Sequence, residues 1–315
     1  MIPIAEIRKA AGVIEGAALR TPLLRLDVPD ADAEIYLKLE NLQPIGSFKI
    51  RGATNAVRQT PPDALADGVV TTSAGNMAQG VAWAAREAGV PCTVIVPDHA
   101  PQTKLAAIDR LGGKVVKVSH DRWWQALMDG GMEGVEGRFV HPVDDELVMA
   151  GNGTIGLELA EDLAEPDAVL IPFGGGGLTV GIASALRELS PRTRVYAVEP
   201  DTAAPLAASL AAGEPREVEY RASFVDGAGA RTVLPNMWPR VRELAEGSLT
   251  ASLAETAGAI RLLLERARVV AEGAGALALA AALSGRAGGG KIVCIVSGGN
   301  IDFSKLETIL AGDTP

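Results

Sequence analysis

Short runs of β-branched and other apolar residues alternate along this chain with longer stretches rich in Ala and Leu. Residues 69–73 precede such a stretch at 77–88, and residues 168–172 precede another at 178–189. A strand followed by a helix, repeated along a chain, predicts right-handed βαβ units, because a helical crossover is what joins parallel strands. The alternation therefore predicts an α/β fold.

The composition limits the kinds of ligand that the chain can hold. Aromatic residues make up only 4% of the 315 residues, so the core must be built from Ala, Leu, Val and Ile. The 29 Lys and Arg residues against 39 Asp and Glu residues give a net charge of −10. A chain of this charge repels nucleic acid and anionic membranes, so neither is expected as a partner. Anionic ligands must be held locally, by loops and helix ends.

Cysteine usage and the N-terminus indicate the cellular compartment. Cys92 and Cys294 each lie within an apolar run, which predicts buried thiols instead of a disulfide or a metal pair. The N-terminal segment has mixed charges and no continuous apolar stretch, unlike a secretory signal. The sequence also lacks a stretch of about 20 apolar residues, the length that a membrane span requires. We therefore expect a cytoplasmic protein.

Three of the predicted strands run directly into glycine-containing turns. Their sequences are SAGN at 73–76, GGGG at 174–177 and SGGN at 297–300. Ligands of open α/β sheets bind where strands end at their carboxyl edge, so these loops are the candidate site. Each loop alone is better explained as a tight turn that needs glycine, but three in one chain indicate a shared ligand.

The tetraglycine at 174–177 is the strongest candidate for binding an anion. Four residues without Cβ allow consecutive backbone N–H groups to converge on one anion, and the following helix adds its positive end. Phosphate is the natural ligand of such a loop. The absence of a following Gly-Lys-Ser/Thr argues against nucleoside triphosphate hydrolysis, and a GxGxxG pattern breaks at Leu178 and Thr179. A dinucleotide-binding fold remains the alternative.

The segment YLKLENLQPIGSFKIRG at 36–52 is the most specific in the chain. A strand enters a turn containing Pro and Gly, and a helix then opens with Ser47 as the expected N-cap. Lys49 follows in the first turn, where the positive end of the helix favours the neutral amine that a Schiff base requires. On spacing alone, a solvated surface lysine is the competing interpretation.

With these segments, the sequence closely resembles the threonine/serine dehydratase and serine racemase family, within the fold type II (tryptophan-synthase-β-like) pyridoxal-phosphate (PLP) enzymes. The resemblance runs from about residue 5 to residue 310 and rests on motifs in a fixed order. Those motifs are KLENLQPIGSFKIRGA (38–53), SAGNMAQGVA (73–82), AGNGTIGLEL (150–159), GGGGL (174–178), VEP (198–200), EGAGA (272–276) and SGGN (297–300).

The resemblance implies two open, twisted, mostly parallel sheets flanked by helices. The larger, PLP-binding domain is expected at residues 1–67 and 147–315, with a smaller domain inserted at 68–146. The small domain carries the loop 73–76 and is expected to close over a bound substrate. A homodimer is also expected.

The resemblance also implies roles for individual residues around the cofactor. Lys49 carries PLP as a Schiff base, Phe48 packs beside it, and Asn76 bonds the hydroxyl of its ring. Ser297 faces the pyridine nitrogen, where a neutral hydroxyl makes a weaker electron sink than a carboxylate and so favours elimination. The phosphate is expected to lie against Gly174, Gly175, Gly176 and Gly177. The substrate carboxylate is expected to lie against Ser73, Gly75, Asn76 and Ala78.

The implied reaction is β-elimination from a small amino acid by a lyase. The Lys49 amine removes the α-proton, the β-hydroxyl leaves, and hydrolysis yields a 2-oxo acid and ammonia. Threonine would give 2-oxobutyrate, and serine would give pyruvate. The alternative is an amino-acid racemase, or a dehydratase for a bulkier 3-hydroxy amino acid. A catalytically silent PLP-binding protein would lack Lys49 or Ser297, and a nicotinamide oxidoreductase would show no absorbance from bound PLP.

Several positions near the expected substrate depart from the family pattern. Ala74 replaces the serine that supplies the acid and base on the opposite face in racemases, so elimination is expected to exceed racemisation. Met77 replaces the usual His and is either a gap-filling core residue or a specificity determinant. Trp123 and Trp124 either pack within the small domain or line a pocket for a larger β-substituent.

The turn that binds a divalent cation in some members is also altered. Its expected ligands fall at Glu199, the Ala203 carbonyl and Pro205. Proline cannot supply a carboxylate, and Mg²⁺ or Ca²⁺ needs several oxygen ligands. We therefore expect no metal at this turn, with rescue by Asp201 as the weaker alternative.

Overall fold

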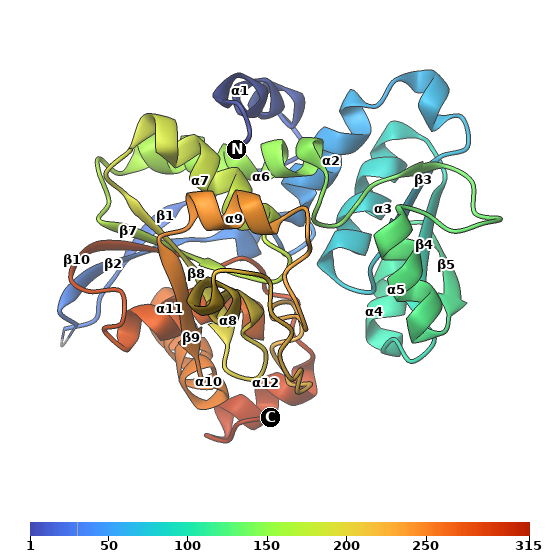
Figure 1. Ribbon diagram of the computed structural model, residues 1–315. Coiled ribbons are helices and arrows are strands. Elements are labelled where there is room, and N and C mark those ends of the chain that lie inside the picture. The colour runs from blue at the N-terminus through green and yellow to red at the C-terminus, as the bar shows by residue number, and fades with distance from the viewer. Residues whose placement is uncertain (30) are drawn as a thin grey trace.

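The computed structural model describes residues 1–29 and 31–315, and within them the strands form two separate sheets (Figure 1). The larger sheet has six strands in the order β1-β2-β10-β7-β8-β9, and the smaller has four in the order β5-β4-β3-β6. In this part of the chain all neighbouring strands pair in parallel except β1 and β2. The predicted α/β fold with two mostly parallel sheets flanked by helices is confirmed.

The strands of the larger sheet are β1 (Leu23–Leu26), β2 (Ala33–Lys38), β7 (Ala168–Pro172), β8 (Arg194–Pro200), β9 (Gly247–Ala251) and β10 (Gly290–Ile295). The strands of the smaller sheet are β3 (Val69–Thr72), β4 (Cys92–Pro97), β5 (Gly113–Val118) and β6 (Arg138–Phe139). The first six α-helices are α1 (Ile4–Val13), α2 (Lys49–Gln59), α3 (Asn76–Ala88), α4 (Gln102–Arg110), α5 (His120–Asp129) and α6 (Glu146–Asp162).

The later helices are α7 (Gly177–Leu189), α8 (Pro205–Ala212), α9 (Trp238–Leu244), α10 (Leu253–Leu262), α11 (Gly273–Leu283) and α12 (Phe303–Leu310). Short segments η1 (Glu40–Leu42) and η2 (Pro62–Leu65) are 3₁₀-helical, and η3 (Leu263–Ala267) is π-helical. Among the described residues, we find no helix with the length and apolar character needed to span a bilayer.

The larger sheet is covered by helices on both faces. Along β7, Leu170 packs into the core formed with α10 and α11, whereas Val169 and Ile171 pack into the core formed with α1, α6 and α7. All five residues of β7 are buried. A strand buried on both faces explains why its sequence is continuously apolar instead of alternating with polar residues.

The smaller sheet lies to one side of the larger one and has its own apolar layers (Figure 1). On one face Val69 and Val94 pack with Val81 of α3, and on the other Val70 and Ile95 pack with α5. Helix α2 joins the two parts of the molecule, because it contacts both α3 and α6. All four strands of this sheet lie within the segment predicted as an inserted domain, and the exact domain limits stay a prediction.

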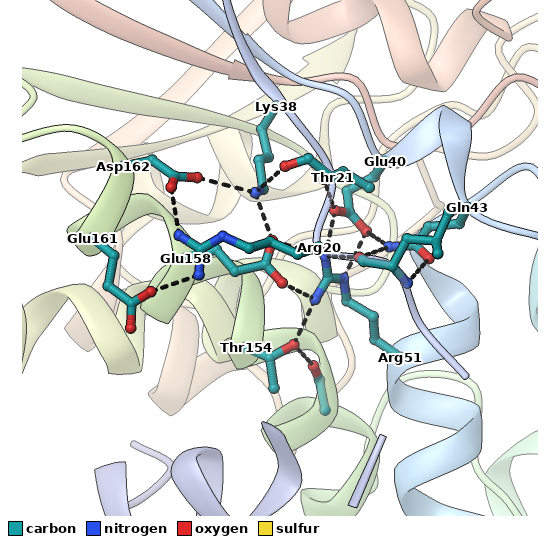
Figure 2. Close-up of polar contacts among 12 residues, drawn as sticks. Arg20, Thr21, Lys38, Glu40, Gln43, Arg51, Thr154, Glu158, Glu161 and Asp162 are labelled. Atoms are coloured by element: carbon teal, nitrogen blue, oxygen red, sulfur yellow. Dashed lines mark hydrogen bonds and ion pairs between the residues drawn. The ribbon is translucent and has the colours of Figure 1, made fainter. Parts of the chain in front are cut away.

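A buried network of charged side chains holds α2 against α6 and β2 (Figure 2). Arg51 of α2 donates from Nε to Glu40 Oε2 at 2.8 Å and from Nη1 to Glu158 Oε1 at 2.6 Å. Lys38 of β2 lies 2.5 Å from the other Glu158 oxygen. Burial alone would raise the pKa of Glu40, but the Arg51 charge and hydrogen bonds outweigh it and lower that pKa. The network therefore anchors the helix that begins at Lys49.

Candidate active site

The three glycine-containing loops meet at one cavity of about 460 Å³. The loop 73–76 connects β3 of the smaller sheet to α3, whereas the tetraglycine 174–177 and the loop 297–300 follow β7 and β10 of the larger sheet. The N-terminus of α2 contributes Phe48 and Lys49 to the same walls. The cavity therefore lies between the two sheets, at the carboxyl ends of their strands.

Most of the residues singled out from the sequence line this cavity. They are Phe48, Lys49, Ser73, Gly75, Asn76, Gly174, Gly175, Gly176, Gly177 and Ser297. Ala78, predicted to contact the substrate carboxylate, is instead fully buried on α3 and does not line the cavity. The sequence motifs thus identified the walls, although the roles predicted for individual residues remain predictions.

Lys49 is the first residue of α2, and among the described residues its amine has no charged hydrogen-bond partner. Its Nζ donates to the backbone carbonyl of Pro142 at 3.0 Å and lies 5.1 Å from the centre of the Phe48 ring. Burial lowers the pKa of Lys49 to about 8, although the Glu272 carboxylate partly offsets this effect. A lysine with this pKa is appreciably neutral near physiological pH, as a nucleophilic or proton-accepting amine must be.

The expectation that Ser47 caps α2 is wrong. The N-cap position belongs to Phe48, and no hydrogen-bond partner of the Ser47 hydroxyl occurs in the described part of the chain. The loop 297–300 holds this segment instead, since the Phe48 N–H donates to the Ser297 carbonyl at 3.0 Å and Ser47 pairs with Gly298. Backbone pairing with that loop replaces the side-chain cap.

The turn that faces Lys49 is shaped by His141. Its Nδ1 accepts the backbone N–H groups of Val143 at 3.0 Å and Asp144 at 2.7 Å. Burial lowers the pKa of His141, which favours the neutral ring that these two bonds require. The folded turn presents the Pro142 carbonyl to the Lys49 amine.

The tetraglycine loop needs glycine because it packs closely against the same turn. A Cβ on Gly175 would lie 2.4 Å from Val143 Cγ2, and one on Gly177 would lie 2.9 Å from the Val143 carbonyl oxygen. Gly176 has a φ of +96°, which side-chain-bearing residues rarely adopt. Helix α7 begins at Gly177, and the first N–H groups of a helix have no partner within it. The loop therefore offers unpaired N–H groups to an anion.

Sequence reasoning missed several polar residues of the cavity wall. Glu272 lines the cavity and accepts from the Asn76 side chain at 2.7 Å, and Lys104 pairs with Asp226 at 2.6 Å. The EGAGA motif contains Glu272, but a motif alone does not reveal which distant side chain a buried carboxylate meets. Lys104 lies on α4 and Asp226 follows α8, so only the folded chain brings them together.

Three of the departures from the family pattern, Ala74, Met77 and Trp123, also lie at the cavity. Trp123 packs on Val70 and Ile95 beneath α5, as the first expectation has it, and it also lines the cavity. A role in holding a larger β-substituent stays a prediction. Trp124 is 38% exposed. Met77 lines the cavity next to the loop 73–76 and is buried.

Glu199 is committed to hydrogen bonds within the protein. Its carboxylate accepts the backbone N–H groups of Leu206 and Ala207 at 2.8 Å each, and the Ser248 hydroxyl at 2.6 Å. These bonds satisfy the first turn of α8, which begins at Pro205. The expected absence of a metal at this turn stays a prediction. The hydrogen bonds support it, because they engage the Glu199 oxygens that a cation would need.

Comparisons with known proteins agree with this geometry. The sequence profile of the family described as "Pyridoxal-phosphate dependent enzyme" matches residues 14–298. An L-threonine ammonia-lyase of Geobacter sulfurreducens is 40% identical over 98% of this chain and 78% of its own length.

Solved structures of related enzymes also share this fold. A maize serine racemase superposes with a TM-score of 0.90 at 32% identity, covering 99% of this chain and 97% of its own. A threonine deaminase isoform 2 from Solanum lycopersicum superposes with a TM-score of 0.87 at 31% identity, covering 98% of this chain and 87% of its own. The predicted resemblance is confirmed, and the chain belongs to the family of pyridoxal-phosphate dependent enzymes.

Proposed function

We propose that this enzyme is a threonine/serine-type ammonia-lyase, which converts a small 3-hydroxy amino acid into a 2-oxo acid and ammonia. The observation that carries the proposal is the shared cavity, which Lys49, the tetraglycine 174–177 and the loop 73–76 all line. The relative named L-threonine ammonia-lyase, matched over 98% of this chain, supports the same reaction.

The cavity walls suit the cofactor of this family. The loop 174–177 has no room for side chains beside Val143 and ends at the first turn of α7, as a phosphate site requires. Lys49 is a lysine with a lowered pKa, as covalent attachment of an aldehyde requires. Ser297 is buried at the cavity wall and carries a neutral hydroxyl. These features favour PLP over a ligand without phosphate or aldehyde.

In this proposal each wall has one task. Lys49 holds the cofactor covalently, Phe48 packs beside it, and Asn76 bonds its ring hydroxyl. Ser297 faces the ring nitrogen, and the phosphate is held by the backbone of Gly174, Gly175, Gly176 and Gly177. The substrate carboxylate is held by Ser73, Gly75 and Asn76, which line the cavity, without Ala78. When bound, PLP supplies an electron sink for the negative charge left on the substrate Cα.

The protein controls the proton that leaves the substrate. The neutral Lys49 amine accepts the α-proton, since burial keeps its pKa near 8. The β-hydroxyl then leaves, and one water is lost and one regained, so that threonine yields 2-oxobutyrate and ammonia. The Pro142 carbonyl accepts from the Lys49 amine at 3.0 Å and so holds it at the cavity wall.

Racemisation is the second reaction that the fold supports, because the maize relative is a serine racemase. It requires a proton donor on the face opposite Lys49. Ala74 lines the cavity at the position where racemases of the family carry the serine that supplies this proton, and alanine cannot donate one. We therefore expect elimination to exceed serine racemisation by at least about tenfold, equivalent to ~1.4 kcal/mol. Chiral chromatography of serine incubated with the wild type and with Ala74→Ser measures this ratio, and equal rates in the wild type would contradict it.

The proposal includes three properties of the whole protein. The enzyme is a cytoplasmic homodimer, and its segment 68–146 moves as a domain that closes over the substrate. Light scattering after size-exclusion chromatography tests the dimer. Small-angle scattering with and without serine tests the closure, and identical curves would argue against it.

The substrate is tested by measuring 2-oxo acid release from a panel of amino acids. Threonine and serine are the expected substrates, and a bulkier 3-hydroxy amino acid is the alternative if Trp123 favours an aromatic substituent. Loss of turnover in Lys49→Ala is expected for every active substrate. Release of 2-oxo acid by Lys49→Ala at the wild-type rate would contradict the assignment.

A further inference from the structure

The motifs EGAGA (272–276) and SGGN (297–300) pack closely against each other beside the cavity. A Cβ on Gly275 would lie 2.2 Å from the Gly298 carbonyl oxygen, so the EGAGA segment at 272–276 and the SGGN loop at 297–300 pack backbone against backbone. The Glu272 N–H donates to the Gly298 carbonyl at 3.0 Å. A Cβ on Gly298 would lie 2.4 Å from Glu272 Oε1, so glycine at that position leaves the room that the carboxylate occupies.

The loop SAGN (73–76) is joined to these two motifs through the side chain of Asn76. Its Nδ2 donates to Glu272 Oε1 at 2.7 Å, and its Oδ1 accepts from Asn300 Nδ2 at 2.8 Å. Asn300 also donates to the Ile45 carbonyl at 2.9 Å. An Asn amide has two N–H donors, so the bond to Glu272 leaves one N–H of Asn76 for another partner. The amide orientation is thus fixed from both ends.

This contact crosses between the two sheets. Asn76 begins α3 beside the smaller sheet, whereas Glu272 immediately precedes α11 and Asn300 follows β10 of the larger sheet. The Lys104–Asp226 pair joins the same two parts of the molecule farther along the cavity wall. These contacts therefore bridge the two parts of the molecule beside the cavity.

Burying the Glu272 carboxylate reduces the free energy of unfolding. The residue is 7% exposed, and burial raises the pKa of its carboxyl to about 7, with a further contribution from the Asp226 charge. The Asn76 hydrogen bond and the charges of Lys104 and Lys49 lower that pKa but do not cancel the effect. The fold does not stabilise the charged form of this buried carboxylate. Its presence is therefore better explained by a role in the active site than by a contribution to stability.

We propose that Glu272 is a positioning residue, whose carboxylate holds the Asn76 amide at the Lys49 cavity and ties the loop 73–76 to the larger sheet. The inference rests on the proposed function, in which Asn76 contacts the cofactor. It gives one task to three motifs that are far apart in the sequence.

The test compares Glu272→Ala with Glu272→Gln. A glutamine retains an oxygen that accepts from Asn76, whereas alanine removes the acceptor. We expect Glu272→Ala to raise the apparent dissociation constant of PLP from the apoprotein by at least about tenfold, and Glu272→Gln by less than about threefold. The KM for threonine follows the same order. Because the buried carboxylate costs stability, the melting temperature of apo Glu272→Ala stays equal to that of the wild type or rises.

Two outcomes would overturn the inference. One is an unchanged PLP dissociation constant in Glu272→Ala. The other is equal loss of PLP affinity in both variants together with a lower apoprotein melting temperature, which indicates a structural role. Asn300→Ala, which removes the second bond to Asn76, is expected to weaken PLP binding in the same direction. A wild type that binds PLP but releases no 2-oxo acid would refute the proposed function, while the PLP titration would still test Glu272.

Discussion

Replacing Glu40 with Gln removes one negative charge beside two buried cations, Lys38 and Arg51. The side chains of Lys38 and Arg51 are 0% and 1% exposed, and that of Glu40 is 0% exposed. The two other carboxylates, Glu158 and Asp162, are 12% and 25% exposed. In Glu40→Gln the two buried cations would therefore rely on carboxylates that solvent partly screens.

The size of the effect follows from these contacts. Removing one partner of a buried ion pair costs roughly 3–5 kcal/mol, because the other charge is left buried. Arg51 keeps Glu158 at 2.6 Å, so we expect the lower end, a loss of about 3 kcal/mol in the free energy of unfolding. At roughly 1.5–2 °C per kcal/mol for a chain of 315 residues, the melting temperature falls by about 4–6 °C.

Urea denaturation and thermal scans of the apoprotein measure this loss. The matched control is Glu34→Gln, because Glu34 pairs with Arg25 at 3.5 Å while 46% exposed, and its loss costs less than about 1 kcal/mol. The pKa of Glu40 lies below its ordinary value of 4.5, so its contribution is complete above that pH and is lost as the pH falls through the lowered pKa. Equal destabilisation by Glu40→Gln and Glu34→Gln at pH 7 would refute the reasoning.

Three further predictions concern the cavity and the altered metal turn. Gly175→Ala is expected to weaken PLP binding by at least about tenfold, because its Cβ would lie 2.4 Å from Val143, whereas Gly12→Ala meets no atom within 4 Å and leaves the titration unchanged. The rate of covalent PLP attachment rises with pH as Lys49 loses its proton, with a midpoint near its pKa of about 8, and a midpoint near 10.5 would contradict the burial argument. EDTA is expected to change turnover by less than about twofold, because the Glu199 oxygens already accept hydrogen bonds from the protein. A melting temperature raised several degrees by Mg²⁺ would instead show that a metal site exists.

The sequence was informative about the elements whose causes are local. The continuous apolar run of β7 followed by glycine predicts a buried parallel strand and a glycine loop before a helix, and the structure has both at Ala168–Pro172 and 174–177. The ordered motifs brought Lys49 and Ser297 to one cavity. In each case the signal lies within a few neighbouring residues.

Contacts between distant segments were not predictable in this way. Ser47 has the sequence signature of an N-cap, but pairing with the loop 297–300 overrides it. Arg51 and Glu158 are separated by 107 positions, and no periodicity in either helix indicates their pairing. The sequence identified Glu272 only as part of the EGAGA motif and did not indicate its role. That role depends on the side chain that the fold brings to the buried carboxylate, here Asn76.

The central claim is that Lys49 holds PLP and removes the proton that starts elimination. Borohydride reduction of the PLP-loaded enzyme, followed by peptide mass spectrometry, measures which lysine carries the cofactor, and a parallel assay with threonine measures 2-oxobutyrate. We expect the cofactor on the peptide containing Lys49, 2-oxobutyrate from the wild type, and none from Lys49→Ala. A cofactor attached to another lysine, or 2-oxobutyrate released by Lys49→Ala at the wild-type rate, would contradict the claim.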